Sequence, residues 1–130
     1  LMLTNNRIGI IDSQDALIGN KAYDLASLID DVRIDTSIEL KRKIYNYYLK
    51  SQKKLSIHKF KNDFEILSIL RNLKIIGIFT RLATRDRKKR YLKLIPYTWK
   101  LINSRIYGNV LFDDLKELLN KNFKKELNEN

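Results

Sequence analysis

The sequence predicts a mainly α-helical protein: an N-terminal β-hairpin followed by a bundle of five or six helices. Three observations lead to this fold class. Two short apolar runs near the start flank turn-forming residues, apolar residues then recur at helical spacing, and only four glycines and one proline occur in the chain. With 130 residues, 44% of them hydrophobic, the chain is long enough for one domain with a core.

The hairpin is predicted over residues 1–11. Leu1-Met2-Leu3 and Arg7-Ile8-Gly9-Ile10-Ile11 are the two apolar runs, and Thr4-Asn5-Asn6 lies between them. Asparagine tolerates the left-handed backbone of tight turns, so the segment favours an antiparallel connection. Because two strands alone are marginally stable, we expect this hairpin to need further partners.

The next two helices are predicted from apolar spacing and a capping signal. Over residues 22–32, apolar residues three or four positions apart share one helix face: Leu25, Leu28, Ile29 and Val32. Thr36-Ser37-Ile38-Glu39 has the spacing of a capping box. It predicts a helix through residue 49 whose apolar side carries Tyr45, Tyr48 and Leu49.

A long helix is predicted over residues 57–82, with Ser56 as its N-cap. Its apolar stripe consists of Phe60, Phe64, Leu67, Leu70, Leu73, Ile76 and then Thr80. The segment 73–79 is apolar on nearly all sides, which indicates the central helix of the core. Gly77 in this segment costs about 1 kcal/mol relative to alanine, so we expect a close packing contact there.

The remaining elements follow a charged interruption at Arg85-Asp86-Arg87-Lys88-Lys89-Arg90, which predicts an exposed connection. Pro96 suits the first turn of a helix that contains Trp99, Leu101 and Ile102, and Gly108 suits its end. A last amphipathic helix, carrying Leu115, Leu118 and Leu119, is predicted over 112–123, and the tail 124–130 is expected to fray. The organisation expected is a hairpin and candidate metal segment at 1–19, a helical subdomain at 20–123, and the tail.

Composition excludes several classes of protein. The absence of cysteine excludes disulfide scaffolds and thiolate metal sites, and it fits a reducing compartment. The sequence has no apolar run of the roughly 18–20 residues that span a membrane, and its start lacks the pattern of a signal peptide. We therefore expect a cytoplasmic protein with no membrane partner.

The net charge of +11 raises the alternative of a nucleic-acid-binding module. Residues 41–110 hold nineteen basic and three acidic side chains, interleaved with the rings of Tyr45, Tyr47, Tyr48, Tyr91 and Trp99. Those rings fall mostly on apolar helix faces, and no nucleic-acid-binding motif is present. Abundant Lys, Asn and Ile are also typical of AT-rich coding, so a solvated basic surface is the favoured interpretation.

The densest polar group lies at the end of the second apolar run. Asp12, Gln14 and Asp15 come together there, and Asp24 follows nearby. A carboxylate held at a strand end suits a hard cation such as Mg²⁺. Spacing alone favours the structural alternative, in which Asp12 ends the strand and Asp15 caps a turn.

Several longer segments of the sequence resemble a known family. The segment Ile10-Ile11-Asp12-Ser13-Gln14-Asp15-Ala16-Leu17-Ile18-Gly19, followed by Ala22-Tyr23-Asp24-Leu25-Ala26-Ser27-Leu28, resembles the aminoglycoside phosphotransferase and choline kinase superfamily. The likeness continues through residues 70–82 and resumes at Arg90-Tyr91-Leu92 and Ile95-Pro96-Tyr97-Thr98-Trp99. Within the superfamily, the sequence of these segments is most similar to that of the bacterial N-acetylmuramate/N-acetylglucosamine kinases of cell-wall recycling.

This resemblance implies the C-terminal lobe of a protein-kinase-like phosphotransferase that uses ATP and Mg²⁺ on an amino sugar. It places Asp12 at the counterpart of the D-F-G aspartate, which binds Mg²⁺, and Asp24 in support of the catalytic loop. Ser13 departs from the aromatic residue usual after that aspartate. Residues 23–33 and 81–90 are expected to contribute to one wall of the sugar pocket.

The family's catalytic loop and nucleotide-binding lobe do not occur in these 130 residues. Phosphoryl transfer needs those parts for positioning and charge neutralisation, so we expect this chain alone to be inactive. It is then a truncated kinase, one half of a split gene or a pseudogene product, and the sequence leaves all three open. The alternative is a basic helical module that binds nucleic acid or pairs with a separately encoded N-terminal kinase half.

Overall fold

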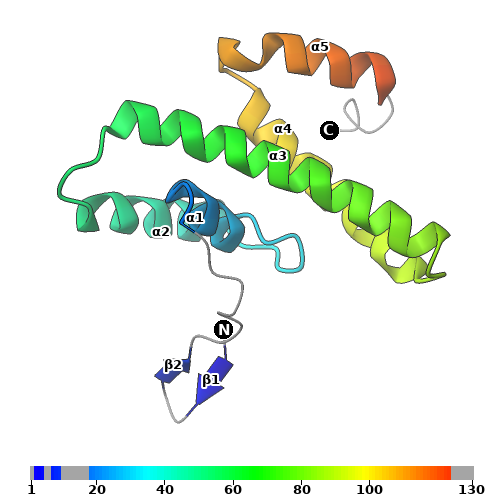
Figure 1. Ribbon diagram of the computed structural model, residues 1–130, viewed down its shortest axis with the longest axis horizontal. Helices are drawn as coiled ribbons and strands as arrows, with labels where there is room; N and C mark the ends of the chain where they lie inside the picture. The colour runs from blue at the N-terminus through cyan, green and yellow to red at the C-terminus, as the bar shows by residue number, and fades with distance from the viewer. Residues whose placement is uncertain (1, 5–6, 10–17, 124–130) are drawn as a thin grey trace.

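The computed structural model describes residues 2–4, 7–9 and 18–123 (Figure 1). The short strands β1 (Met2–Thr4) and β2 (Arg7–Gly9) pair antiparallel, with Leu3 opposite Ile8. The five α-helices of the described residues are α1 (Ala22–Ile29), α2 (Ile38–Ser51), α3 (Ile57–Thr84), α4 (Ile95–Ile106) and α5 (Asp113–Asn122). Two 3₁₀ segments, η1 (Lys89–Leu94) and η2 (Val110–Phe112), precede α4 and α5. The predicted fold class is confirmed.

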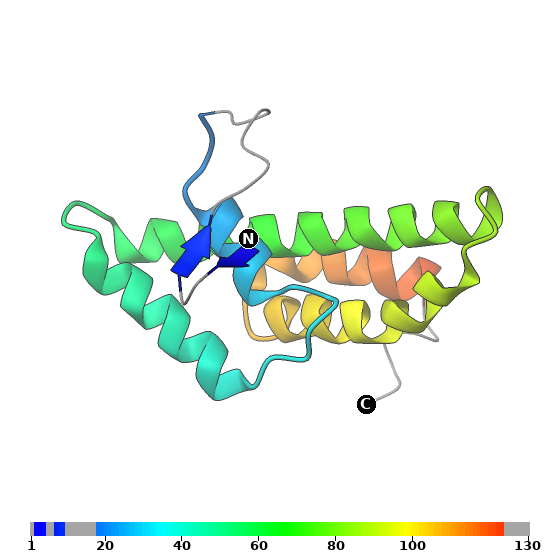
Figure 2. The same ribbon diagram turned by 90° about the horizontal axis from the view of Figure 1, so that it is seen from below.

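The long helix α3 is the element against which the others pack. In Figure 1 it crosses the whole molecule, with α1 and α2 on one side and α5 on the other. Figure 2 shows α4 running beside the C-terminal part of α3, while α2 lies toward its N-terminal part. Helices α1, α4 and α5 contribute buried apolar residues and α2 contributes partly buried ones, so a central helix with apolar residues on several faces is needed to receive them.

The core consists of three clusters along α3. One joins α1 to the start of α3 through Ala22, Leu25, Ala26, Ile29, Phe60 and Phe64. A second joins the middle of α3 to α4 and α5 through Ile69, Trp99, Ile102, Ile106, Phe112 and Leu119. A third, near the end of α3, contains Val32, Phe79 and Leu101. Full burial of one such large apolar side chain is worth about 1.5–3 kcal/mol.

The face that α3 buries differs from the predicted stripe. Leu70 and Thr80 are exposed, whereas the polar residues Ser68 and Asn72 are fully buried. These two side chains are hydrogen-bonded to each other, and Ser68 also donates to Asp30, which lies directly after α1. Apolar periodicity does not detect buried polar residues that are held in this way. The apolar helix 22–32 also ends earlier than predicted, at Ile29, and Leu28 on it is exposed.

Two local predictions are wrong. Gly77 is exposed, and a Cβ built on it meets nothing within 4 Å, so no close packing explains this glycine. The capping residue of α2 is Ser37 instead of Thr36, because the Ser37 Oγ accepts a hydrogen bond from the Leu40 N–H at 3.3 Å. Ser56 does occupy the N-cap of α3, but its side chain makes no capping hydrogen bond.

The C-terminal half follows the prediction more closely. The connection after α3 is exposed and turns at Arg87, which has a φ of 55°. Pro96 lies in the first turn of α4, and Gly108 follows its end with a φ of 88°, a conformation that favours glycine. The tail 124–130 lies outside the described residues. In the described part of the chain, none of the helices is both long and apolar enough for a membrane crossing.

Candidate functional site

The most heavily bonded side chain of the described residues is Asp30, directly after α1. Only 1% of it is exposed. The Arg105 guanidinium of α4 donates from Nη2 to both carboxylate oxygens, at 3.1 and 3.0 Å, and from Nε at 3.2 Å. Lys41 Nζ of α2 donates at 3.3 Å and Ser68 Oγ of α3 at 2.6 Å. One buried carboxylate therefore joins four helices.

Further polar contacts surround this carboxylate. The Arg71 guanidinium donates to the Asp30 backbone carbonyl at 3.3 Å, and Asn72 Nδ2 donates to the Ser68 Oγ at 3.5 Å. The side chains of Lys41 and Arg105 are 13% and 23% exposed. A charge buried to this degree is tolerated only when it is paired and hydrogen-bonded, and Asp30 meets both conditions.

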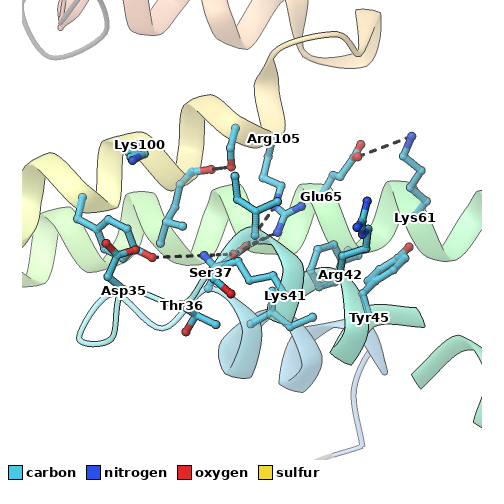
Figure 3. Close-up of a pocket in the computed structure, with 17 residues that line it drawn as sticks. Asp35, Thr36, Ser37, Lys41, Arg42, Tyr45, Lys61, Glu65, Lys100 and Arg105 are labelled. Atoms are coloured by element: carbon cyan, nitrogen blue, oxygen red, sulfur yellow. Dashed lines mark hydrogen bonds and ion pairs between the residues drawn. The ribbon is translucent and has the colours of Figure 1, made fainter. Parts of the chain in front are cut away.

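A pocket of about 490 Å³ opens beside Asp30, between α2, α3, α4 and the loop that connects α1 to α2 (Figure 3). Basic side chains outnumber acidic ones in its lining. The basic residues are Lys41, Arg42, Lys61, Lys100 and Arg105, and the acidic residues are Asp30, Asp35 and Glu65. The rest of the wall is formed by the apolar and aromatic residues Ile29, Ile38, Tyr45, Phe64, Tyr97 and Leu101 together with the polar residues Thr36, Ser37 and Ser104.

Some of these charges are paired and others are not. Lys61 lies 4.0 Å from the Glu65 carboxylate, which also accepts a hydrogen bond from Asn109 at 2.8 Å. Arg42 and Lys100 are exposed and form no ion pair within the described residues. The lining therefore carries an excess of positive charge, part of which has no acidic partner among the described side chains.

Two tyrosines, Tyr45 and Tyr97, line the pocket. The Tyr97 hydroxyl accepts a hydrogen bond from Lys41 Nζ at 3.4 Å. The Tyr45 hydroxyl is buried and has no hydrogen-bond partner in the described part of the chain. Burial, followed by the charge of Glu65, raises the pKa of Tyr45 above its ordinary value of 10.0.

The residues predicted to carry chemistry lie elsewhere. Asp12, with Gln14 and Asp15, falls in residues 10–17, outside the described part of the chain. Asp24 is exposed in the first turn of α1, where a carboxylate also interacts favourably with the helix dipole. No group of three potential metal-binding side chains (His, Cys, Asp or Glu) occurs within residues 2–4, 7–9 and 18–123.

The two ranges expected at a sugar pocket behave differently. Ile29 and Asp30, from the range 23–33, line the pocket, whereas no residue of 81–90 does. Most of the rings considered for nucleic-acid stacking are used in packing. Trp99 is buried, Tyr45 and Tyr48 pack against Phe60, and Tyr91 stacks on Phe79. Tyr47 is the member of that set that is exposed.

Asp30 and its partners were not predicted from the sequence. These partners lie 11 to 75 residues away in the chain, so no local spacing connects them. One local signal is present: Asp30 follows the buried residues Ala22 and Ala26 at intervals of four, which places it on the buried face of α1. A carboxylate in phase with a buried stripe predicts a cationic partner.

Comparison with known proteins gives a consistent group of relatives. The chain is 36% identical over 108 residues to the N-acetylmuramate/N-acetylglucosamine kinase of Caulobacter vibrioides, a match that covers 83% of this chain and 28% of that protein. The enzyme of the same name from Neisseria meningitidis is 37% identical over 102 residues, or 74% of this chain and 30% of that protein. No protein-family model matches the sequence.

A third relative extends the match along the chain. The N-acetylmuramate/N-acetylglucosamine kinase of Pseudomonas aeruginosa is 30% identical over 125 residues, 92% of this chain and 37% of that protein. The chain is a homologue of part of these kinases. It spans about a third of the length of the curated relatives it matches.

Proposed function

We propose that this chain supplies the C-terminal third of an ATP-dependent kinase that acts on N-acetylated amino sugars. The observation that carries this proposal is the 36% identity over 108 residues to a kinase named for N-acetylmuramate and N-acetylglucosamine. The helical architecture is compatible with it, because a helical subdomain is what the resemblance in the sequence implies for this part of the enzyme.

In this proposal Asp12 binds the Mg²⁺ that neutralises the phosphates of ATP during transfer of the γ-phosphoryl group to a sugar hydroxyl. Mg²⁺ prefers oxygen ligands such as carboxylates, and Asp12 provides a carboxylate directly after Ile10 and Ile11. Asp24 accepts hydrogen bonds from the backbone of the catalytic loop. Its exposure in the first turn of α1 leaves the carboxylate accessible to such a loop.

In this proposal the nucleotide-binding lobe and the catalytic loop lie outside these 130 residues. We propose that residues 1–19 form the metal-binding segment, that 20–123 form the helical subdomain, and that the chain alone has no kinase activity. An N-terminal kinase half, on the same polypeptide or encoded separately, then supplies the nucleotide-binding lobe and the catalytic loop.

A chimera tests this assignment. The segment of the Caulobacter vibrioides kinase that matches this chain is replaced by the homologous residues of this chain, and ATP-dependent phosphorylation of N-acetylmuramate and N-acetylglucosamine is measured. We expect activity in the chimera, its loss to background in Asp12→Asn, and a strong reduction in Asp24→Asn. The matched control is Asp113→Asn, an exposed carboxylate in the first turn of α5, which should retain activity.

The purified 130-residue chain provides the complementary measurement. With ATP, Mg²⁺ and either sugar, we expect no turnover. A folded chimera without activity, or one in which Asp12→Asn has no effect, would contradict the proposal. Turnover by the isolated chain would contradict its predicted dependence on the N-terminal half.

A further inference from the structure

A dense cluster of basic side chains lies at the end of α3 and in the turn and η1 that follow it. Residues 81–93 hold seven basic side chains and one acidic side chain. In Figure 1 and Figure 2 this part of the chain forms one end of the long axis of the molecule. No residue of 81–93 lines the pocket beside Asp30. The seven basic residues are exposed and are called here the basic tip: Arg81, Arg85, Arg87, Lys88, Lys89, Arg90 and Lys93.

Little of this charge is neutralised within the fold. Asp86 pairs with Arg85, whose Nε donates to the carboxylate at 2.7 Å. The other six cations form no ion pair among the described residues. Like charges held this close together repel one another and lower the free energy of unfolding. A bound anion would relieve this repulsion.

The turn within the basic tip has a backbone conformation that suits glycine better than arginine. Arg87 has a φ of 55°, and the N–H of Lys88 closes the turn by donating to the Leu82 carbonyl at 2.9 Å. Helices commonly end with a glycine in this left-handed conformation, because a Cβ disfavours it. Arginine therefore places a charge at a position where its backbone lowers stability. Such a cost is typical of positions that serve a function.

Compositional bias does not account for the cluster. The abundance of lysine that AT-rich coding gives acts along the whole chain, whereas four of the nine arginines lie within residues 81–90. The planar guanidinium group of arginine can donate two parallel hydrogen bonds to one phosphate. A cluster of guanidinium groups with one acidic neighbour is therefore suited to a partner with closely spaced phosphates.

The ring and the apolar side chain at the tip restrict which phosphate partner fits. Tyr91 stacks on Phe79 with ring centroids 5.3 Å apart, and the Arg90 guanidinium lies 5.2 Å from the Tyr91 ring. This ring is engaged within the fold, whereas single-strand binding uses free rings on which bases stack. The large apolar side chain exposed in this segment is Leu92, at 43%, whereas insertion into a membrane surface uses a whole apolar helix face.

We propose that the basic tip binds the phosphodiester backbone of double-stranded nucleic acid without reading its bases. A duplex presents one phosphate charge per about 1.7 Å of its axis, which matches a tip that offers charge and no free ring. Arg87, Lys88 and Lys89 contact the phosphates, and the net charge of +11 adds long-range attraction. The inference goes beyond the proposed kinase function and uses neither the pocket nor residues 1–19.

The test is a fluorescence anisotropy titration of a labelled DNA duplex with the purified 130-residue chain at several salt concentrations. Each phosphate contact contributes about −0.9 to the slope of the logarithm of the binding constant against that of the salt concentration. The six cations without an ion pair therefore set a limit of about −5 on the slope that the tip contributes. We expect a duplex of shuffled sequence to bind equally well and one strand of the duplex to bind more weakly.

Paired variants separate the tip from general attraction by a basic protein. Arg87→Gln with Lys89→Gln removes two charges from the tip and leaves the pair of Arg85 with Asp86 intact. We expect the slope to become less steep by about 2 and the affinity to fall at least roughly fivefold. Lys43→Gln with Lys50→Gln removes the same net charge from exposed positions on α2 and should leave the slope unchanged.

A single substitution separates charge from backbone strain at the turn. Arg87→Gly should raise the melting temperature, because glycine tolerates a φ of 55°, yet it should weaken duplex binding as much as Arg87→Gln does. A more stable variant that binds less well is the result expected for a residue kept for its charge.

Four results would overturn the inference. They are an unchanged slope in the tip variant, equal weakening by the α2 pair, tighter binding of the single strand than of the duplex, and binding to vesicles containing phosphatidylglycerol without binding to the duplex. The last result would assign the tip to a membrane surface. The titration requires neither ATP nor turnover, so failure of this inference and failure of the kinase assignment are distinguishable.

Discussion

At Tyr45, a single hydroxyl group affects the stability of the folded protein. Its ring packs against Phe60 and Phe64, with ring centroids 6.1 and 5.0 Å away, so the apolar part of the side chain is well used. Its hydroxyl, by contrast, is buried without a hydrogen-bond partner in the described residues. A buried polar atom in this state costs about 1–3 kcal/mol relative to one that is satisfied.

We therefore expect Tyr45→Phe to leave the free energy of unfolding at neutral pH unchanged or to raise it by up to about 1 kcal/mol. The pKa of Tyr45 is raised by burial, so the unfolded chain ionises first as pH rises above the ordinary value of 10.0. Below that pH, Tyr45 is protonated in both states and its ionisation does not lower the free energy of unfolding. Above that pH, the free energy of unfolding falls as pH rises. Tyr45→Phe should remove part of this alkaline loss in urea unfolding curves.

The matched control is Tyr47→Phe on the same helix, because Tyr47 is exposed and its hydroxyl is in solvent. Its unfolding curves should match those of the unmodified chain at neutral and alkaline pH. Equal pH profiles for the two variants would contradict the role assigned to burial of the Tyr45 hydroxyl.

For Asp30, the neighbouring residues in the sequence reveal that it is buried but not which side chains it contacts. Its phase with Ala22 and Ala26 places it on the buried face of α1, and this phase is readable in the sequence. Its partners on α2, α3 and α4 are fixed only by how the helices pack, since Arg105 lies 75 residues further along the chain. The candidate pocket is built on those long-range pairs, so the sequence alone did not predict it.

At the scale of elements, the helices were predictable where end signals are local. Pro96 and Gly108 mark the limits of α4, and the charged run after Thr84 ends α3. The buried face of α3 was less predictable, because Ser68 and Asn72 lie inside through polar contacts to Asp30 and to each other. Hydrophobic spacing is insensitive to a stripe that includes buried polar residues.

Gly77 gives a prediction for α3 itself. It lies in the interior of a 28-residue helix, is exposed, and has open space where a Cβ would be. Gly77→Ala should therefore raise the free energy of unfolding by about 0.5–1 kcal/mol, through helix propensity and reduced entropy of the unfolded chain. Thermal unfolding followed by circular dichroism measures this change.

Gly108→Ala is the contrasting variant. There a Cβ also meets no neighbour, but the φ of 88° disfavours any other residue, so alanine should lower the melting temperature. Opposite signs for the two substitutions are expected. A destabilised Gly77→Ala variant would instead support the close packing contact that the sequence pattern predicts.

At the scale of the whole molecule, the cluster of Asp30 with Lys41, Ser68 and Arg105 joins helices that otherwise meet mainly along α3. Removal of one partner from a buried ion pair costs about 3–5 kcal/mol, because the other charges are left unpaired. We therefore expect Asp30→Asn to lower the free energy of unfolding by that amount in urea titrations. Asp31→Asn should cost at most about 1 kcal/mol, because its partner Arg33 is 76% exposed.

A rescue variant keeps this prediction testable if Asp30→Asn fails to fold. Asp30→Leu combined with Arg105→Met replaces the main buried pair by apolar side chains and should recover a large part of the loss. Equal stability of Asp30→Asn and Asp31→Asn would contradict the role given to the cluster.

The position of Asp30 also bears on how cooperatively the molecule unfolds. The cluster containing Phe60 and Phe64 joins α1 to the start of α3, whereas the cluster containing Ile69 joins α3 to α4 and α5. The Asp30–Arg105 pair provides a further link between these two clusters, because it joins the end of α1 directly to α4. With it, amide hydrogens of α1 and α4 should exchange through one shared opening; without it, each end would open independently.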